Sequence, residues 1–380
     1  MPSYSGVWTL QAQMQAVAAG QWTGQPQLFA WGNNAKGQLG LGNTTDYSSP
    51  KQVGALTGWS NLAQGGRHAL SVKTNGTLWA WGYNIFGQLG LNDVASRSSP
   101  VQVGALTGWS SVAGGQYFAT AIKTNGTLWG WGRNNQGQLG INNIVNSSSP
   151  VQVGALTTWY QVAAGASFTM AIKTDGTLWS WGYNNFGQLG LNDYSAYTQR
   201  SSPVQIGALT TWYQVVTSNT HAIATKTDGT LWSWGYNNRG QLGLGDTNNR
   251  SSPVQVGALT TWYQISAGGS GFTVAIKTDG TLWSWGRNNS GQLGINNTAY
   301  RSSPVQVGAL TTWSKVANGE SHIIAVKTDG TLWSWGGNDA GKLGLGDTDG
   351  RSSPVQVGAL TTWLTLSKMP TSGFSLAIKG

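Results

Sequence analysis

A repeat of about fifty residues constrains this chain more than any other feature. Its most constant part is the stretch 78–82, which reads Leu-Trp-Ala-Trp-Gly and is followed by Gly-Gln-Leu-Gly at 87–90. The second tryptophan recurs at intervals of 50 to 53 residues, at Trp31, Trp81, Trp131, Trp181, Trp234, Trp285 and Trp335. A fixed period in this range indicates repeated units that bury a shared core. The length of 380 residues would otherwise suggest two or three domains, but the period favours one closed array.

One full unit, residues 55–104, contains four short strand signals separated by turn residues. The expected strands are 59–63, 68–74, 77–83 and 101–104. Asn75-Gly76, between the second and third strands, predicts a type I′ hairpin turn in which both residues have positive φ. Four short strands in a unit of this length are typical of a β-propeller blade.

The two ends of the sequence complete one unit between them. The last residues, 374–380, match the second strand of the unit, and the missing third strand is found at 27–32. The predicted fold class is therefore all-β: a seven-bladed β-propeller of four-stranded antiparallel blades, closed by N- and C-terminal strands that share one blade. The expected blades are 55–104, 105–154, 155–207, 208–257, 258–308, 309–358, and 359–380 plus 27–54, and residues 1–26 form a separate extension.

Three tryptophan columns run through the repeat. The first (Trp59, Trp109, Trp159, Trp212, Trp262, Trp313, Trp363) and the third (Trp31, Trp81, Trp131, Trp181, Trp234, Trp285, Trp335) are predicted to lie buried between adjacent sheets, and the second holds Trp79, Trp129, Trp179, Trp232, Trp283 and Trp333. The apolar area that they bury offsets the conformational entropy of 56 glycines. These columns are predicted to build the fold and to make no contact with a partner.

The formal net charge of +9 is distributed over the repeat. Seven lysines occupy one column (Lys73, Lys123, Lys173, Lys226, Lys277, Lys327, Lys379), and five arginines another (Arg97, Arg200, Arg250, Arg301, Arg351). We interpret both columns as solvated single charges, since no Lys/Arg-rich run of the kind that follows a phosphate backbone is present. The sequence thus predicts no specific nucleic-acid binding. It also contains no apolar run long enough for membrane insertion and no ordinary signal peptide.

Residues that could carry chemistry follow the repeat. The absence of cysteine excludes disulfides, Cys-ligated zinc and thiol catalysis. His68, His221 and His322 share a column with Phe118, Phe168, Phe272 and Phe374, which predicts a buried ring rather than a metal ligand. Asp175, Asp228, Asp279 and Asp329 replace Asn75 and Asn125 in the hairpin turn, where hydrogen bonds from side chain to main chain explain them. We predict no enzyme, no catalytic residue, no metal site and no cofactor.

Differences between the repeats fall on one side of the predicted ring. The loops from first to second and from third to fourth strand share one side, here called the variable face, while the hairpins and the links between blades form the constant face. The expected partner-binding residues on the variable face are Tyr83, Phe86, Arg133, Tyr183, Phe186, Tyr194, Tyr197, Tyr236, Arg239 and Arg287. Such aromatic and arginine side chains suit recognition of a glycan or a protein. The alternative is that the rings pack over neighbouring blades.

The extension 1–26 does not match the repeat. Thr9 could cap a short helix, with Leu10, Met14 and Val17 on one stripe, and Trp8 and Trp22 flank it. These residues either form a lid on the propeller or anchor it to another protein. Because residue 27 enters its strand from the constant face, we expect the extension to leave the ring opposite the variable loops.

The motifs Gly-Thr-Leu-Trp-Ser-Trp-Gly, Asn-x-x-Gly-Gln-Leu-Gly and Ser-Ser-Pro, in fixed order over 28–380, resemble the regulator of chromosome condensation repeat family. The resemblance implies a seven-bladed propeller with both termini in one blade. It does not imply one function, because members include a nucleotide exchange factor for a small GTPase, a secreted β-lactamase inhibitor and interaction proteins.

Residues 5–20 resemble short leaders of tail and fibre proteins of tailed bacteriophages, and the near-identical repeats suit a recently duplicated viral or bacterial gene. We therefore expect a non-enzymatic virion protein, a tail fibre, appendage or decoration on the outside of a phage particle. It would bind other virion proteins through 1–26 and a host-surface glycan or protein through the variable face. The alternatives are an intracellular regulator like a guanine-nucleotide exchange factor, which should carry a basic tail and an acidic insertion, or a secreted inhibitor or lectin, which should carry a signal peptide.

Overall fold

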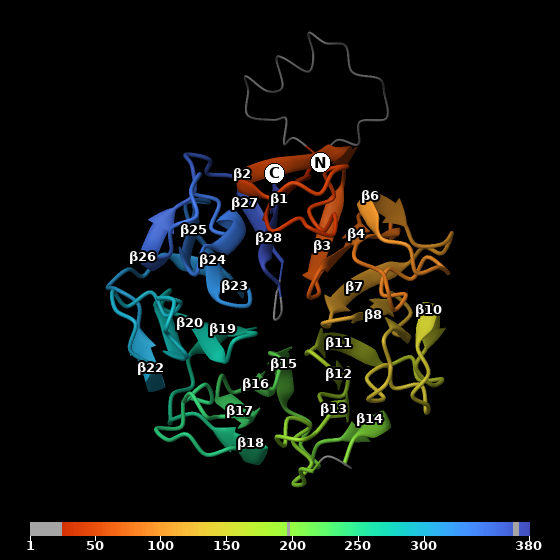
Figure 1. Ribbon diagram of the computed structural model, residues 1–380. Helices are drawn as coiled ribbons and strands as arrows, with labels where there is room; N and C mark the ends of the chain where they lie inside the picture. The colour runs from red at the N-terminus through yellow and green to blue at the C-terminus, as the bar shows by residue number, and fades with distance from the viewer. Residues whose placement is uncertain (1–24, 196–197, 368–371) are drawn as a thin grey trace, which may run out of the picture.

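Seven four-stranded antiparallel sheets form a closed ring (Figure 1). The computed structural model describes residues 25–195, 198–367 and 372–380. In Figure 1 the first strand of each blade lies nearest the centre of the ring, and the fourth strand lies at the rim. The predicted fold class is confirmed.

The strands follow the repeat in chain order. Blade 1 has β3 (Trp59–Gln64), β4 (His68–Lys73), β5 (Leu78–Gly82) and β6 (Arg97–Gln102), and blade 2 has β7 (Trp109–Gly114), β8 (Phe118–Lys123), β9 (Leu128–Gly132) and β10 (Ser147–Gln152). Blade 3 has β11 (Trp159–Ala164), β12 (Phe168–Lys173), β13 (Leu178–Gly182) and β14 (Arg200–Gln205), and blade 4 has β15 (Trp212–Thr217), β16 (His221–Lys226), β17 (Leu231–Gly235) and β18 (Arg250–Gln255). Blade 5 has β19 (Trp262–Gly268), β20 (Phe272–Lys277), β21 (Leu282–Gly286) and β22 (Arg301–Gln306). Blade 6 has β23 (Trp313–Asn318), β24 (His322–Lys327), β25 (Leu332–Gly336), the 3-10 turn η1 (Asp339–Gly341) and β26 (Arg351–Gln356).

Blade 7 is built from both ends of the described chain, residues 27–57 and 363–379, which lie side by side (Figure 1). Its strand order is β2 (Tyr47–Thr57), β1 (Gln27–Gly32), β28 (Phe374–Lys379) and β27 (Trp363–Leu366). The pairing of β1 with β28 is unbroken from Gln27 opposite Lys379 to Gly32 opposite Phe374. This shared blade leaves no open edge between blades 6 and 1, as the sequence predicted.

A hydrogen bond from the third tryptophan column joins each blade to the one before it. The indole N–H of Trp131 donates to the main-chain oxygen of Gln88 at 3.0 Å, and the same bond recurs in all seven blades. Gly90, in the Gly-Gln-Leu-Gly loop, has φ +73°, and a Cβ there would lie 2.9 Å from Trp131 Nε1. The motif therefore needs its last glycine because the next blade's tryptophan packs on it. We call this arrangement the latch.

The remaining tryptophans and the lysine column form a second layer, which corrects one prediction. Every tryptophan of the first and third columns is at most 5% exposed, as expected. However, the ammonium group of Lys173 lies 5.0 Å from the ring centroid of Trp159 and 3.6 Å from that of Trp179. Six of the seven lysines are held between two indoles in this way. The solvated-charge interpretation of the lysine column is wrong, since these cations pack on aromatic faces.

Two local predictions also differ from the structure. At the hairpin only Gly76 has positive φ (+75°). Gly76 N–H donates to Lys73 O, and Lys73 N–H donates to Thr77 O. These bonds define a three-residue loop with a glycine bulge instead of a type I′ turn. The fourth strand begins at Arg97, not at residue 101. Its register shifts between the pairs Ala80–Val101 and Gly82–Arg97, so the strand accommodates a proline in a bulge at the sheet edge.

Candidate partner-binding face

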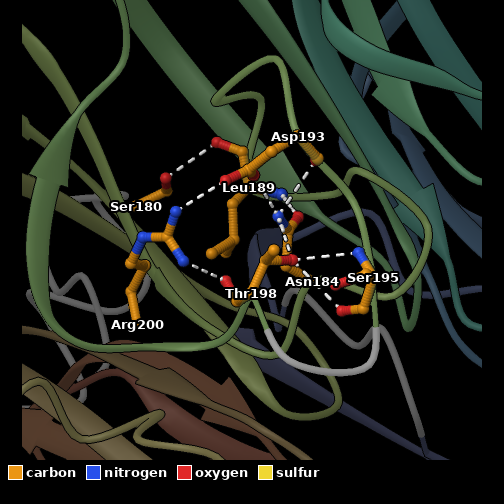
Figure 2. Close-up of polar contacts among 7 residues, drawn as sticks. All are labelled: Ser180, Asn184, Leu189, Asp193, Ser195, Thr198 and Arg200. Atoms are coloured by element: carbon orange, nitrogen blue, oxygen red, sulfur yellow. Dashed lines mark hydrogen bonds and ion pairs between the residues drawn. The ribbon is translucent and has the colours of Figure 1, made fainter.

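The long loops of the variable face are held by side chains that repeat in every blade. Figure 2 shows the longest one, in blade 3. The Asn184 amide accepts from Leu189 N–H at 3.0 Å and donates to the Asp193 carboxylate at 2.6 Å. The Arg200 guanidinium then pairs with Asp193 at 2.6 Å and donates to the Thr198 carbonyl at 2.6 Å. The variable face is thus a set of fixed loops rather than loose ones.

The arginine column is largely used inside these loops. Arg97, Arg200, Arg250 and Arg351 each form an ion pair with an aspartate of their own loop, at 2.5 to 2.6 Å. Arg301 differs, because its loop has Asn297 in place of the aspartate, and it donates to the Tyr300 carbonyl at 3.1 Å. The net positive charge therefore does not form a basic patch from this column.

Three of the predicted partner-binding residues lie in one cluster across blades 1 and 2. Tyr83 and Phe86 both contact Tyr117 edge to face, with ring centroids 6.4 and 5.3 Å away. The guanidinium of Arg133 lies 5.1 Å from the Phe86 ring, and the ammonium of Lys36 lies 5.5 Å from the Tyr83 ring. The four residues of blades 1 and 2 are half-buried, so they pack over neighbouring blades and still present a surface. Tyr117 and Lys36 were not predicted from the sequence.

A second cluster forms at blades 3 and 4. Tyr183 and Phe186 have ring centroids 6.5 Å apart, and Phe186 lies 4.4 Å from Tyr236 of the next blade. Arg239 lies beside Gly271, and Arg287 donates to Asn289 at 2.6 Å, so both stand apart from the aromatic rings. Tyr194, in the long loop between β13 and β14, is 64% exposed. The predicted Tyr197 lies outside the described residues.

The histidine column is buried, as predicted. His68, His221 and His322 are fully enclosed, and burial lowers the pKa of His68 to about 4 and that of His221 to about 3. His221 bonds Thr273 Oγ1 at 3.1 Å, and His322 bonds Ser375 Oγ at 2.9 Å. His68 has no such partner among the described residues, because the corresponding residue is Ala119. In the part of the chain that the structure describes, no three His, Cys, Asp or Glu residues could hold one metal ion.

A further feature that sequence reasoning missed is a polar basin in the variable face. It has a volume of about 370 Å³, and loops of five blades line it. Its charged members are Arg67, Glu320, Asp339 and Lys342. The signal was present in the sequence, since Glu320 is the only glutamate and Lys342 replaces the glutamine of Gly-Gln-Leu-Gly.

Comparison with known proteins identifies the family. The RCC1-like domain matches residues 27–375. This chain belongs to the RCC1-like domain family.

Two human proteins are among the relatives of this RCC1-like chain. Human protein RCC2 is 37% identical over 89 residues, which are 23% of this chain and 17% of RCC2. Human HERC3, a probable E3 ubiquitin-protein ligase, is 34% identical over 102 residues, 26% of this chain and 10% of HERC3. The chain thus spans a fifth or less of the length of these two relatives.

Solved structures give the fold over nearly the whole RCC1-like ring. Yeast RCC1 (Prp20), solved bound to Kap60, superposes with a TM-score of 0.84 at 22% identity, over 93% of this chain and 89% of that one. A second structure of Prp20p from Saccharomyces cerevisiae, described with its binding to Gsp1p and histones, has a TM-score of 0.82 at 23% identity and covers 94% and 92% of the two chains.

These findings overturn the function and the location expected from the sequence. The matched relatives are RCC2, HERC3 and yeast RCC1, rather than proteins of a phage particle. The prediction of a virion protein facing the outside of a bacteriophage is therefore wrong, and the intracellular-regulator alternative is better supported. The error came from weighing a leader of some twenty residues and the regularity of the repeats, neither of which encodes a partner.

The RCC1-like match begins at residue 27, after the extension. Trp8, Leu10, Met14, Val17 and Trp22 lie outside the described residues, so their role as an anchor stays a prediction. No helix among the described residues has the length and apolar character needed to cross a membrane.

The constant face of the RCC1-like ring carries one feature that the sequence analysis overlooked. Tyr160, Tyr213 and Tyr263 follow the first tryptophan in blades 3, 4 and 5 and are 54 to 62% exposed. Each lies in a β-bulge of the first strand. In blade 3, for example, Trp159 pairs with Lys173 and Gln161 pairs with Ile172, so Tyr160 is the extra residue. Other blades have serine or leucine here, and this exchange was the readable signal.

Proposed function

We propose that this RCC1-like propeller is a protein-binding module of an intracellular regulator and that it binds its partner through the variable face. The observation that carries the proposal is the clustering of half-buried aromatic rings on the variable loops, with the Arg133 guanidinium packed on one of the two clusters. Tyrosine and arginine side chains at the centre of an interface supply most of its binding energy, and the two clusters provide both kinds.

The geometry favours a protein over a small ligand on this face. The clusters at blades 1–2 and at blades 3–4 draw on loops of four successive blades, and we take them as two anchors that one protein surface could engage together. Because the loops are already fixed by hydrogen bonds such as those of Asn184 and Asp193, binding requires little ordering of the ring. A folded protein surface could therefore engage both anchors at a modest entropic cost.

The relatives suggest which partners to test. Solved structures of yeast RCC1 concern its complex with Kap60 and its binding to Gsp1p and histones. We extend these partners to this chain as candidates, and an exchange-factor-like action on a small GTPase is the specific form to examine. Binding is the core of the proposal, and nucleotide exchange is one outcome of its test.

We further propose that the chain acts by binding rather than catalysis. Its three histidines are buried. The aspartates of the hairpins accept hydrogen bonds from the threonine two residues later: Asp175 accepts from the Thr177 hydroxyl at 2.7 Å and from the Thr177 N–H at 2.9 Å. The extension 1–26 would contribute a second protein contact. A glycan on the variable face is an alternative outcome of the same experiment.

The test measures binding of Gsp1p, a core histone mixture and Kap60 to the immobilised chain by biolayer interferometry, together with nucleotide release from Gsp1p. We expect at least one partner to bind, and the double variant Tyr183→Ala, Phe186→Ala to bind at least tenfold more weakly. The matched control is Tyr160→Ala, Tyr213→Ala on the constant face, which should bind normally. Failure of all three partners, or a loss confined to the control, would overturn the proposal, and binding of a glycan array alone would replace it.

A further inference from the structure

The polar basin in the variable face concentrates departures from an otherwise regular repeat. Lys342 stands where the other six blades have glutamine. Gly337 stands where five blades have tyrosine or arginine and one has Asn33. Ala340, at φ +60°, is the only positive-φ residue other than glycine and asparagine in the described chain. All three belong to blade 6, next to the basin's Glu320.

These departures have a physical effect in common. Gly337 has no side chain at the position of Tyr83 in blade 1, and the turn η1, with Ala340 at φ +60°, brings Asp339 and Lys342 together at the edge of the basin. Backbone strain of this kind persists where the surrounding structure requires it and is frequent at functional sites. Blade 6 thus departs from the repeat at the residues beside the basin.

Lys342 is a buried cation with an exposed partner. Its ammonium group pairs with the Asp339 carboxylate at 2.7 Å, and the two side chains are 4% and 92% exposed. If the Asp339 carboxylate leaves this ion pair, solvent hydrates it. The buried ammonium of Lys342 then needs another anion in place of that carboxylate. The pair is therefore suited to exchange one carboxylate for another that enters from the solvent.

Other residues of the basin add both a second cation and an unsatisfied acceptor. Arg67 lies exposed in the loop between β3 and β4. The side-chain oxygen of Asn219 is buried and has no hydrogen-bond partner among the described residues. An incoming ligand that supplies a carboxylate to Lys342 and an N–H to Asn219 would satisfy both, and a peptide segment with an acidic side chain has these two groups.

We propose that the polar basin is an exchangeable carboxylate site, in which an acidic side chain of the protein partner displaces Asp339 from Lys342 and is also bound by Arg67. The inference rests on the proposed function, because the carboxylate belongs to the protein held on the variable face. With Asp339 displaced, the basin carries two cations against Glu320 alone. His322, beneath Lys342, remains neutral because burial and the lysine charge both lower its pKa.

The probes are fluorescein-labelled pentapeptides, Gly-Ser-Glu-Gly-Ser and its glutamine counterpart Gly-Ser-Gln-Gly-Ser, titrated by fluorescence anisotropy against the full chain. We expect the glutamate peptide to bind at least tenfold more tightly than the glutamine peptide. Lys342→Gln, which restores the residue of the other six blades and should fold, should abolish this preference. Asp339→Asn should strengthen binding of the glutamate peptide severalfold, because it removes the internal competitor.

Three outcomes overturn the site. These are equal binding of the two peptides, an unchanged preference in Lys342→Gln, or weaker glutamate binding in Asp339→Asn, which would make the ion pair merely structural. Sodium glutarate, titrated as a competitor, separates the sources: displacement of the peptide at equal concentration would assign the site to small carboxylates. The matched control Arg301→Gln, which removes a cation from a loop of the same face outside the basin, should leave the preference unchanged. Partner binding that survives Lys342→Gln would reject this site and leave the proposed function standing.

Discussion

The latch and the polar basin share the stretch around Gly-Gln-Leu-Gly, from which the basin takes Asp339, Ala340 and Lys342, yet they differ in what the repeat preserves. In the latch, each of seven indole N–H groups donates to the preceding blade, and no copy deviates. In the basin, Lys342 is the one member of its column that is not glutamine, although its main-chain oxygen still accepts the latch bond from Trp31. One residue thus serves the ring with its main chain and the surface with its side chain.

The difference between latch and basin separates the residues that folding requires from those that it leaves free to vary. Main-chain groups and indoles that join blades are identical because every blade needs them. Side chains that point away from the ring vary because folding does not depend on them. Three substitutions, taken from the largest expected effect to the smallest, test this division.

Removing a latch indole should have the largest effect. Trp131→Ala should lower the free energy of unfolding by about 3–5 kcal/mol, because it leaves a large cavity and an unpaired Gln88 oxygen. The measurement is urea unfolding followed by circular dichroism. The half-buried Trp129→Ala, two residues away, is the control and should lose about 2 kcal/mol. If both variants lost the same free energy of unfolding, the latch tryptophans would be no more important to stability than the half-buried ones.

The histidine column should show an intermediate effect that depends on pH. His68 has a folded-state pKa of about 4, below its ordinary value of 6.5, because burial disfavours the charged ring. The unfolded chain therefore binds a proton first, and the stability present above pH 6.5 falls as the pH drops toward 4. His68→Phe, the residue of four other blades, should remove about 3 kcal/mol of this loss between pH 7 and pH 4.

Urea unfolding of His68→Phe and of the unchanged chain at pH 7, 5.5 and 4 measures the difference. Phe168→Leu provides a control without a titrating ring, and its stability relative to the parent chain should not depend on pH. A constant difference between His68→Phe and the parent at all three pH values would contradict burial of a neutral histidine.

A loop ion pair on the variable face should have the smallest effect. Arg250→Ala breaks the pair with Asp246, whose side chains are 27% and 35% exposed, and should cost about 1 kcal/mol or less because solvent screens such pairs. Arg301→Ala, in a loop with Asn297 in place of the aspartate, removes the same side chain without an ion pair. The difference between the two variants in thermal unfolding isolates the pair. A loss above about 3 kcal/mol for Arg250→Ala would place the loops among the essential parts of the fold.

The fold could be predicted because its signals are either local or repeated in every unit. These signals are the period of the tryptophans, the position of Asn75-Gly76 in the hairpin and the matching of the two ends to one unit. The turn at Gly76 was assigned the wrong type because the hydrogen bond between Lys73 and Thr77 fixes a three-residue loop, and that pairing is not visible in a dipeptide. Lys173 was taken as solvated because its two indole neighbours lie on different strands.

The site was predicted less completely, for a reason of geometry. Tyr83, Phe86 and Arg133 were found because each follows a Trp-Gly, but their common neighbour Tyr117 comes from another loop. The basin draws on five blades, so no window of sequence contains it. Lys342 and Glu320 were nevertheless visible as breaks in a regular pattern, and in a chain this repetitive such breaks carry more information than composition does.

The pairing of β1 with β28 has a mechanical consequence. Gln27 and Lys379 face each other at the same end of this strand pair, so a load applied through the two chain ends peels the pairs apart one after another instead of shearing them together. The ring should therefore open at low force in an optical trap and shed its blades in sequence from that seam. A single high-force rupture would contradict this unzipping geometry. The closed ring thus has one defined seam, the pairing of β1 with β28, at which tension opens it.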